Sequence, residues 1–229
     1  MRKAKAPKDA ELVRPVTFVC DGATTGLLTE LVEDQDEWGL RLEGRWGPGS
    51  ESTVPSPGPH LISAKGVQGS KAAVKLAAER QPQAFAADKL DDKALAALGK
   101  QPKLRALRVW YTKITDDGLA TIASFKGLTQ LNAGNNAGVT AEGLVQLSKL
   151  SKLTHLNIEA TALDDRGLKA IAKLKKLRHL EIAATKVTDE GVEALFDHPA
   201  LEHVSVFSTK ASKKCIKRLE SCLKTPAKR

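Results

Sequence analysis

One segment recurs along the chain at an almost constant spacing. Its clearest copies begin at Leu153, Leu177 and Leu201, and each reads Leu-x-His-(Leu/Val)-x-(Ile/Val)-x-x-Thr. One apolar anchor per copy steps by 24, 25, 24, 24 and 24 residues along the series Leu90, Ile114, Val139, Leu163, Val187 and Ala211. Self-similarity at such a period is typical of a solenoid, in which each unit is one supersecondary element stacked on the next.

Each copy combines the signals of a strand and of a helix. Apolar and polar side chains alternate around Leu156–Ile158, as in a strand with one buried face. A turn residue follows in each unit, at Thr112, Asn136, Thr161, Thr185 and Thr209. A residue that can cap a helix comes next, at Thr115, Thr140, Asp164 and Thr188, with acidic residues in the first turn behind it. The sequence therefore predicts five strand–helix units over residues 90–210.

The consensus L-x-x-L-x-L-x-x-T-x-I-T-D-x-G-L resembles the leucine-rich repeat family over residues 66–223. The Thr in place of the usual Asn and the T-D-x-G-L tail are most similar to the cysteine-containing subclass, which is also common in bacterial repeat proteins. The resemblance implies an α/β fold, a right-handed horseshoe segment with parallel strands on its concave side and helices outside. It also implies that partners bind on the concave strand face.

Composition divides the rest of the chain. Residues 1–13 form a charged tail that we expect to be mobile, 14–46 a small β-rich element, and 47–65 a linker rich in Pro, Gly and Ser. Residues 66–89 resemble a capping half-repeat with a helix over 70–80, residues 211–223 a closing helix, and 224–229 a basic tail. Strands are predicted at 15–20, 27–33 and 39–43, with a helix over 25–38 as the alternative to the second.

Several classes of protein are excluded or disfavoured. No run approaches the ~18 apolar residues of a membrane span, the basic start leads into no apolar segment of a secretory signal, and three cysteines make no disulfide framework. We therefore expect a cytoplasmic monomer with free thiols and no cofactor. The motifs G-x-S-x-G, H-E-x-x-H, C-x-x-C and the Walker loop are absent, so an enzyme would require a pocket around Cys20 and His60.

The outward positions of the predicted strands fall into columns. We expect them to bind a protein partner, as an adaptor would, through Arg108, Trp110, Tyr111, Gln130, Asn132, His155, Asn157, Glu159, His179, Glu181, His203, Ser205 and Phe207. Exposed aromatic side chains are common binding hot spots, although Trp110 could instead pack against the N-terminal segment. Because the cysteine-containing subclass includes F-box substrate receptors, a receptor-like subunit is an alternative, but no F-box helices precede the repeats.

Two groups of titratable residues invite a catalytic or metal-binding interpretation. His155, His179 and His203 share a column and could meet zinc or copper, but parallel side chains on adjacent strands converge poorly, and repeat duplication explains the row. We predict no metal. The Asp pairs at 91/92, 116/117 and 164/165 recur at helix starts, so capping explains them better than catalysis does.

The net charge of +9 lies entirely in residues 87–229. Its densest part is a basic patch at the C-terminal end, made of Lys210, Lys213, Lys214, Lys217, Arg218 and Lys224, with Lys228 and Arg229 beyond it. Such a patch could attract nucleic acid or another acidic partner. No aromatic residues for base stacking interleave it, so nucleic acid stays an alternative to a protein partner.

Overall fold

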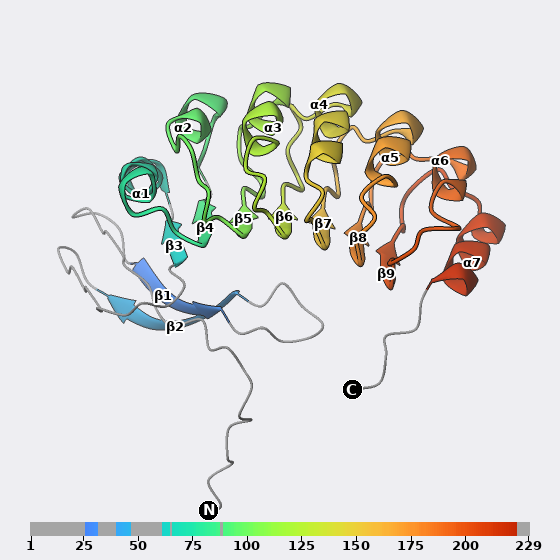
Figure 1. The fold of residues 1–229 in the computed structure, drawn as a ribbon, viewed down its shortest axis with the longest axis horizontal. Coiled ribbons are helices and arrows are strands. Elements are labelled where there is room, and N and C mark those ends of the chain that lie inside the picture. Colours follow the sequence, from blue (N-terminus) through green and yellow to red (C-terminus); the bar gives the residue numbers. More distant parts are fainter. Residues whose placement is uncertain (1–25, 32–39, 47–60, 65, 88, 224–229) are drawn as a thin grey trace, which may run out of the picture.

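A parallel sheet of seven short strands runs the length of the repeat region and carries its helices on one side (Figure 1). The computed structural model describes residues 26–31, 40–46, 61–64, 66–87 and 89–223. The strands are β3 (Leu61–Ala64), β4 (Ala84–Ala87), β5 (Ala106–Arg108), β6 (Gln130–Asn132), β7 (His155–Asn157), β8 (His179–Glu181) and β9 (His203–Ser205). They lie in chain order, each beside the next.

A helix follows every strand of this sheet. The helices are α1 (Gly66–Arg80), α2 (Asp92–Ala96), α3 (Asp116–Ile122), α4 (Ala141–Gln146, continued by a 3-10 turn, Leu147–Lys149), α5 (Asp165–Ile171), α6 (Asp189–Glu193) and α7 (Lys213–Cys222). Figure 1 shows the helices along the outer side of an arc and the strands along its inner side. The predicted solenoid of inner parallel strands and outer helices is confirmed.

The core is a continuous stack of apolar layers between strands and helices. In the register of the sheet, Leu107 lies beside Leu131, which lies beside Leu156 and then Leu180, and all four are at most 1% exposed. Burial of each leucine side chain stabilises the folded chain by about 1.5–3 kcal/mol. Since a single unit has no second face to pack on, this burial exists only when units stack.

The turn after each strand has one repeated backbone conformation. A residue with positive φ occupies the same place in five units, at Tyr111, Asn135, Ala160, Ala184 and Ser208. The next residue closes the turn: the Thr161 hydroxyl donates to the Ile158 carbonyl at 2.7 Å, and Thr185 does the same to Ile182. Asn136 fills this place in the second unit and donates to the Val109 and Ala133 carbonyls. These bonds satisfy backbone groups where the chain leaves the sheet.

The sheet begins earlier than the sequence predicts. Strand β3 lies inside residues 47–65, which the composition assigns to a linker, and pairs in parallel with β4, placing Ile62 beside Phe85. Helix α1 likewise begins before the predicted start at Ser70, and Ser70 is buried rather than a cap. Both extensions cover the open edge of β4, and neither a short strand nor a buried serine gives a distinct sequence signal.

A separate antiparallel pair precedes the solenoid. It consists of β1 (Gly26–Leu31) and β2 (Leu40–Trp46), paired from Gly26 beside Trp46 to Leu31 beside Leu40, with a register shift between Leu27 and Thr29. Of the two alternatives for the stretch after residue 25, the structure has the strand. The predicted strand at 15–20, the tails 1–13 and 224–229, and linker residues 47–60 lie outside the described residues.

Candidate interaction surface

Two columns of side chains line the surface of strands β5 to β9 that faces away from the helices, and we call this surface the strand face. The first column is Ala106, Gln130, His155, His179 and His203, and the second is Arg108, Asn132, Asn157, Glu181 and Ser205. Trp110, Glu159 and Phe207 follow just beyond their strands. The predicted alignment is therefore confirmed. It places the sequence-predicted residues of five units on one continuous surface.

The members of the strand face differ in how available they are. Asn132 and Asn157 are each only 8% exposed, and their side-chain oxygens accept from backbone N–H groups two residues ahead, of Gly134 at 3.3 Å and Glu159 at 3.0 Å. The sequence predicts open, partner-binding positions here. The structure shows instead that both amides turn back onto their own strand ends, where they satisfy the backbone.

The three histidines of the first column lie in a row. The rings of His155 and His179 stack with centroids 4.4 Å apart, and the His203 ring lies 6.1 Å from that of His179 at a tilt. His203 Nε2 is 3.3 Å from Glu181 Oε1, and His179 Nε2 is 3.8 Å from Glu202 Oε2. The row therefore has carboxylates beside its last two members, which become ion pairs when the imidazoles are protonated.

Burial, together with the nearby His179 and Arg178, lowers the pKa of His155 to about 4, while Glu202 opposes the shift. The first imidazole of the row is therefore neutral at neutral pH. Among residues that the structure places, no three His, Cys, Asp or Glu side chains form a group that could hold a metal ion.

Aromatic side chains lie at both ends of the strand face. Tyr111 is 64% exposed and Phe207 is 67% exposed, whereas Trp110 is half-buried with its ring 5.6 Å from that of Tyr111. Arg108 lies over the Trp110 ring at 5.9 Å, and Lys89 over the Tyr111 ring at 6.0 Å. Aromatic side chains, Trp and Tyr above all, are enriched among the residues that dominate the binding energy of protein interfaces.

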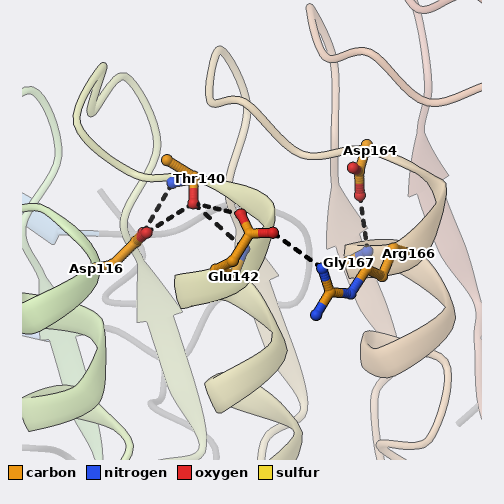
Figure 2. Close-up of polar contacts among 6 residues, drawn as sticks. All are labelled: Asp116, Thr140, Glu142, Asp164, Arg166 and Gly167. Atoms are coloured by element: carbon orange, nitrogen blue, oxygen red, sulfur yellow. Dashed lines mark hydrogen bonds and ion pairs between the residues drawn. The ribbon is translucent and has the colours of Figure 1, made fainter.

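The recurring aspartates at the helix starts join neighbouring units. Asp116 accepts from the backbone N–H of Thr140 at 2.8 Å and from its hydroxyl at 2.6 Å (Figure 2). Corresponding pairs join Asp92 to Thr115, Asp165 to Thr188 and Asp189 to Ser212. We call this set of four aspartates the carboxylate ladder. Because each carboxylate is held by the next helix start, the ladder fits a structural role.

The carboxylate ladder is interrupted once, and the neighbouring unit changes with it. Ala141 occupies the place of the aspartate in α4. In the next unit Asp164 replaces the capping threonine, and its own carboxylate accepts from the Gly167 N–H at 3.0 Å (Figure 2). An exposed ion pair between Arg166 and Glu142, at 2.9 Å, bridges the two units instead. Two facing carboxylates are thereby avoided.

Glycines in the first helical turns leave room for the carboxylate ladder. A Cβ added at Gly143 would lie 2.1 Å from Asp116 Oδ1, and one at Gly191 would lie 2.3 Å from Asp165 Oδ1. Both separations are far below van der Waals contact. Glycine at these positions therefore lets each helix start approach the carboxylate of the preceding unit.

The C-terminal basic patch lies on and before α7. Lys210, Lys213, Lys214, Lys217 and Arg218 are exposed, and Lys224 lies outside the described residues. Arg218 is directed over the Phe196 ring at 4.7 Å. The Ser212 hydroxyl caps the helix by accepting from the Cys215 N–H, and burial raises the pKa of the Cys215 thiol. Cys215 is therefore an unreactive core residue.

One buried histidine is absent from the residues that the sequence singles out. His198 occupies the place that Leu150 and Leu174 hold in earlier units. Its Nδ1 accepts from the backbone N–H of Leu201 at 3.1 Å, and Nε2 lies 3.1 Å from the Leu174 carbonyl. The ring thus joins the loop before β9 to the preceding unit. Its position in the repeat is the only signal that could have revealed this role.

Comparison with known proteins places this architecture. A family model described as Leucine Rich repeat matches residues 100–123, 149–172 and 173–196. The solved structure of an internalin (inlF) from Listeria monocytogenes is similar with a TM-score of 0.55 and 18% sequence identity, over 74% of this chain and 47% of the internalin. The chain thus spans about half the length of that protein. Its fold is that of the leucine-rich repeat proteins.

Two plant ectodomains resemble the chain more distantly. The BIR2 ectodomain from Arabidopsis thaliana has 14% identity and a TM-score of 0.38 over 53% of this chain and 62% of its own. The Arabidopsis receptor kinase HAESA ectodomain, solved with a peptide hormone, has 10% identity and a TM-score of 0.42 over 68% of this chain and 30% of its own. Similarity as weak as this supports no conclusion about the chain.

Proposed function

We propose that this chain is a non-enzymatic module that binds a protein partner across the strand face. The observation that carries the proposal is the pair of exposed aromatic ends, Tyr111 and Phe207, on a surface whose middle is polar. Interfaces commonly combine aromatic anchors with hydrogen-bonding groups around them. The in-register columns supply both on one surface.

The rigidity of the strand face supports the proposal. Backbone bonds continue past each strand into its turn: the Ala160 N–H donates to the Ala183 carbonyl at 2.9 Å, and the Ala184 N–H donates to the Phe207 carbonyl at 3.0 Å. Side chains on such a framework lose little conformational freedom on binding. A partner can therefore be held at a smaller entropic cost than by a loop of the same composition.

The test is capture of a partner by the full chain, with cross-linking and mass spectrometry to locate the contacts. The variant Tyr111→Ala/Phe207→Ala is compared with Lys173→Ala/Lys176→Ala, which changes exposed residues after α5. We expect the aromatic variant to lose the partner at low and high salt and the lysine variant to retain it. Cross-links confined to the helical side, or equal loss in both variants, would contradict the proposal.

A second candidate function is binding of an acidic partner through the basic patch. The supporting observation is the exposure of Lys213, Lys214, Lys217 and Arg218 on the single helix α7. Substituting the three lysines with glutamine tests it without removing the buried Cys215 and Leu219 of that helix. Loss of the partner in this variant, together with a steep salt dependence, would favour this candidate over the first.

The finer expectations from the sequence stay predictions. They are membership of the cysteine-containing subclass, a cytoplasmic location, a bacterial adaptor role and an F-box-like receptor role.

No described helix is both long and apolar enough to cross a membrane.

A further inference from the structure

The strand face differs at its two ends. At the β5 end, Lys89, Arg108, Trp110 and Tyr111 form a group that we call the cation–aromatic cluster, linked by the ring contacts of 5.6–6.0 Å. Lys89, Arg108 and Tyr111 are exposed. Among the residues that the structure places, no carboxylate lies within ion-pair distance of either cation.

The other end carries carboxylates. Glu159, Glu181 and Glu202 lie on or beside β7, β8 and β9. Arg178 is held by Glu202, with Nη2 2.6 Å from Oε1, so its charge is largely neutralised there. The polarity of the strand face therefore changes from cationic at β5 to acidic at β7–β9.

We propose that the cation–aromatic cluster binds an acidic segment of the protein partner and so fixes the direction in which that partner crosses the strands. This inference rests on the proposed function. A guanidinium over the face of a ring keeps its N–H edge available for a carboxylate. An acidic polypeptide that is confined to this end avoids Glu159 and Glu181.

The same polarity disfavours a nucleic acid on this surface. A strand of nucleic acid carries a charge at every nucleotide, so its continuation over β7–β9 would meet Glu159 and Glu181. Stacking rings and cations alone would suit either ligand. The carboxylates at the far end are what favour a polypeptide, because acidic residues can be clustered in one part of it.

The test measures binding of defined probes to the full chain by fluorescence anisotropy. The probes are a labelled Glu/Ser peptide of about ten residues with its Glu residues in one half and its Ser residues in the other, long enough to span the ~19 Å from β5 to β9, its counterpart with Lys in place of Glu, and a labelled oligothymidylate of similar length. We expect the Glu/Ser peptide to bind and Arg108→Glu to weaken it at least tenfold. Lys173→Glu makes the same charge change at an exposed site near the end of α5 and should alter binding less than twofold.

Several results would overturn the inference. Equal weakening by Arg108→Glu and Lys173→Glu would mean that only net charge attracts the probe, and stronger weakening by Lys213→Glu/Lys214→Glu would assign the binding to the basic patch. Tighter binding of oligothymidylate that depends on Arg108 and Trp110 would identify a nucleic-acid site. Self-association abolished by Arg108→Glu would assign the cluster to a second copy of the chain.

The acidic ligand and the proposed function can fail separately. If the aromatic double variant loses the captured partner but the Glu/Ser peptide does not depend on Arg108, the interaction module stands and its acidic ligand is wrong. If the peptide binds at Arg108 but cross-links to the captured partner avoid the strand face, the cluster is real and the proposed function is wrong.

Discussion

Individual side chains of the strand face occupy unequal environments although they hold equivalent places in the repeat. His155 is enclosed between Thr154, whose hydroxyl lies 2.9 Å from Nδ1, and the stacked ring of His179. His203, at the far end of the row, is exposed. Equivalent places in the repeat therefore differ in their chemistry. The pKa of the enclosed His155 lies well below the ordinary value for histidine.

The enclosure of His155 predicts a dependence of stability on pH. The folded chain takes up this proton at a pKa of about 4, whereas an unfolded histidine takes it up near pH ~6.5. The unfolded state therefore binds more protons between these values, and the free energy of unfolding should fall as pH drops through that window.

Urea denaturation from neutral pH down to the lower end of that window, with NMR titration of the ring, measures this effect. The variant His155→Gln should lose part of the pH dependence, because its amide does not titrate. A His155 resonance that titrates near the ordinary histidine value of ~6.5 would show that the ring is not desolvated in solution.

The turn residues with positive φ predict a gain in stability. Ala184 has φ of 54° and is exposed, so Ala184→Gly removes a backbone conformation that only glycine adopts without strain. We expect stabilisation of up to about 1 kcal/mol. Ala194→Gly is the matched control, because Ala194 is exposed with an ordinary helical φ of −64°, and it should destabilise by about 0.5–1 kcal/mol. Urea midpoints measure both, and equal changes would refute the role of φ.

At the scale of elements, the carboxylate ladder sets how one helix start meets the next. Asp189 shows the strength of the contact: hydrogen bonds from the backbone N–H and hydroxyl of Ser212 hold the pKa of its carboxyl below the ordinary value. The interruption at Ala141 and Asp164 indicates that the two residues at a helix–helix junction are matched: an aspartate faces a threonine, and an alanine faces an aspartate.

This pairing can be tested by a double-mutant cycle. Ala141→Asp places a carboxylate opposite that of Asp164 and should destabilise the chain. Asp164→Thr alone exchanges one capping residue for a slightly weaker one and should cost about 0.5 kcal/mol or less. The double variant recreates the Asp–Thr pair found at Asp116 and Thr140, so we expect a coupling energy of about 1 kcal/mol or more in its favour. Additive effects in chemical denaturation would show that the two positions are independent.

At the scale of the molecule, stability should be distributed along the array. Leu156 is fully buried in the middle strand, and Leu219 is 1% exposed in the closing helix α7. We expect Leu156→Ala to cost about 2–5 kcal/mol in global unfolding. Leu219→Ala should instead accelerate hydrogen exchange of α6, β9 and α7 while leaving β5–β7 protected. Uniform acceleration along the sheet would show that the array unfolds as one cooperative unit.

The parts of this structure that the sequence predicts are those fixed by the repeat period itself. Leu107, Leu131, Leu156 and Leu180 recur with the spacing, so the strands, their register and the outer helices follow from it. Contacts between units are less visible. The sequence places Asp116 and Asp165 in the first turns of their own helices, but it does not show that they reach the next unit.

The burial of Asn132 and Asn157 likewise cannot be predicted from the sequence, because the side-chain amide of an outward-facing strand residue can still turn onto the backbone. The contacts of His198 and the pairing of β3 depend on which backbone groups the neighbouring chain segments leave without a hydrogen-bond partner. Each of these features concerns the conformation of one side chain or one short segment, about which the repeat period carries no information.

The residue at position 213 bears on whether the array can grow end to end. Lys213 stands where earlier units carry the ladder aspartate, and Cys215 stands in place of the following glycine. A helix start stacked on α7 would find an ammonium group where the ladder aspartates of earlier units offer a carboxylate. Head-to-tail association is the route by which repeat proteins form open-ended fibres. The exchange of a carboxylate for an ammonium group at Lys213 therefore removes from α7 the contact by which one unit receives the next.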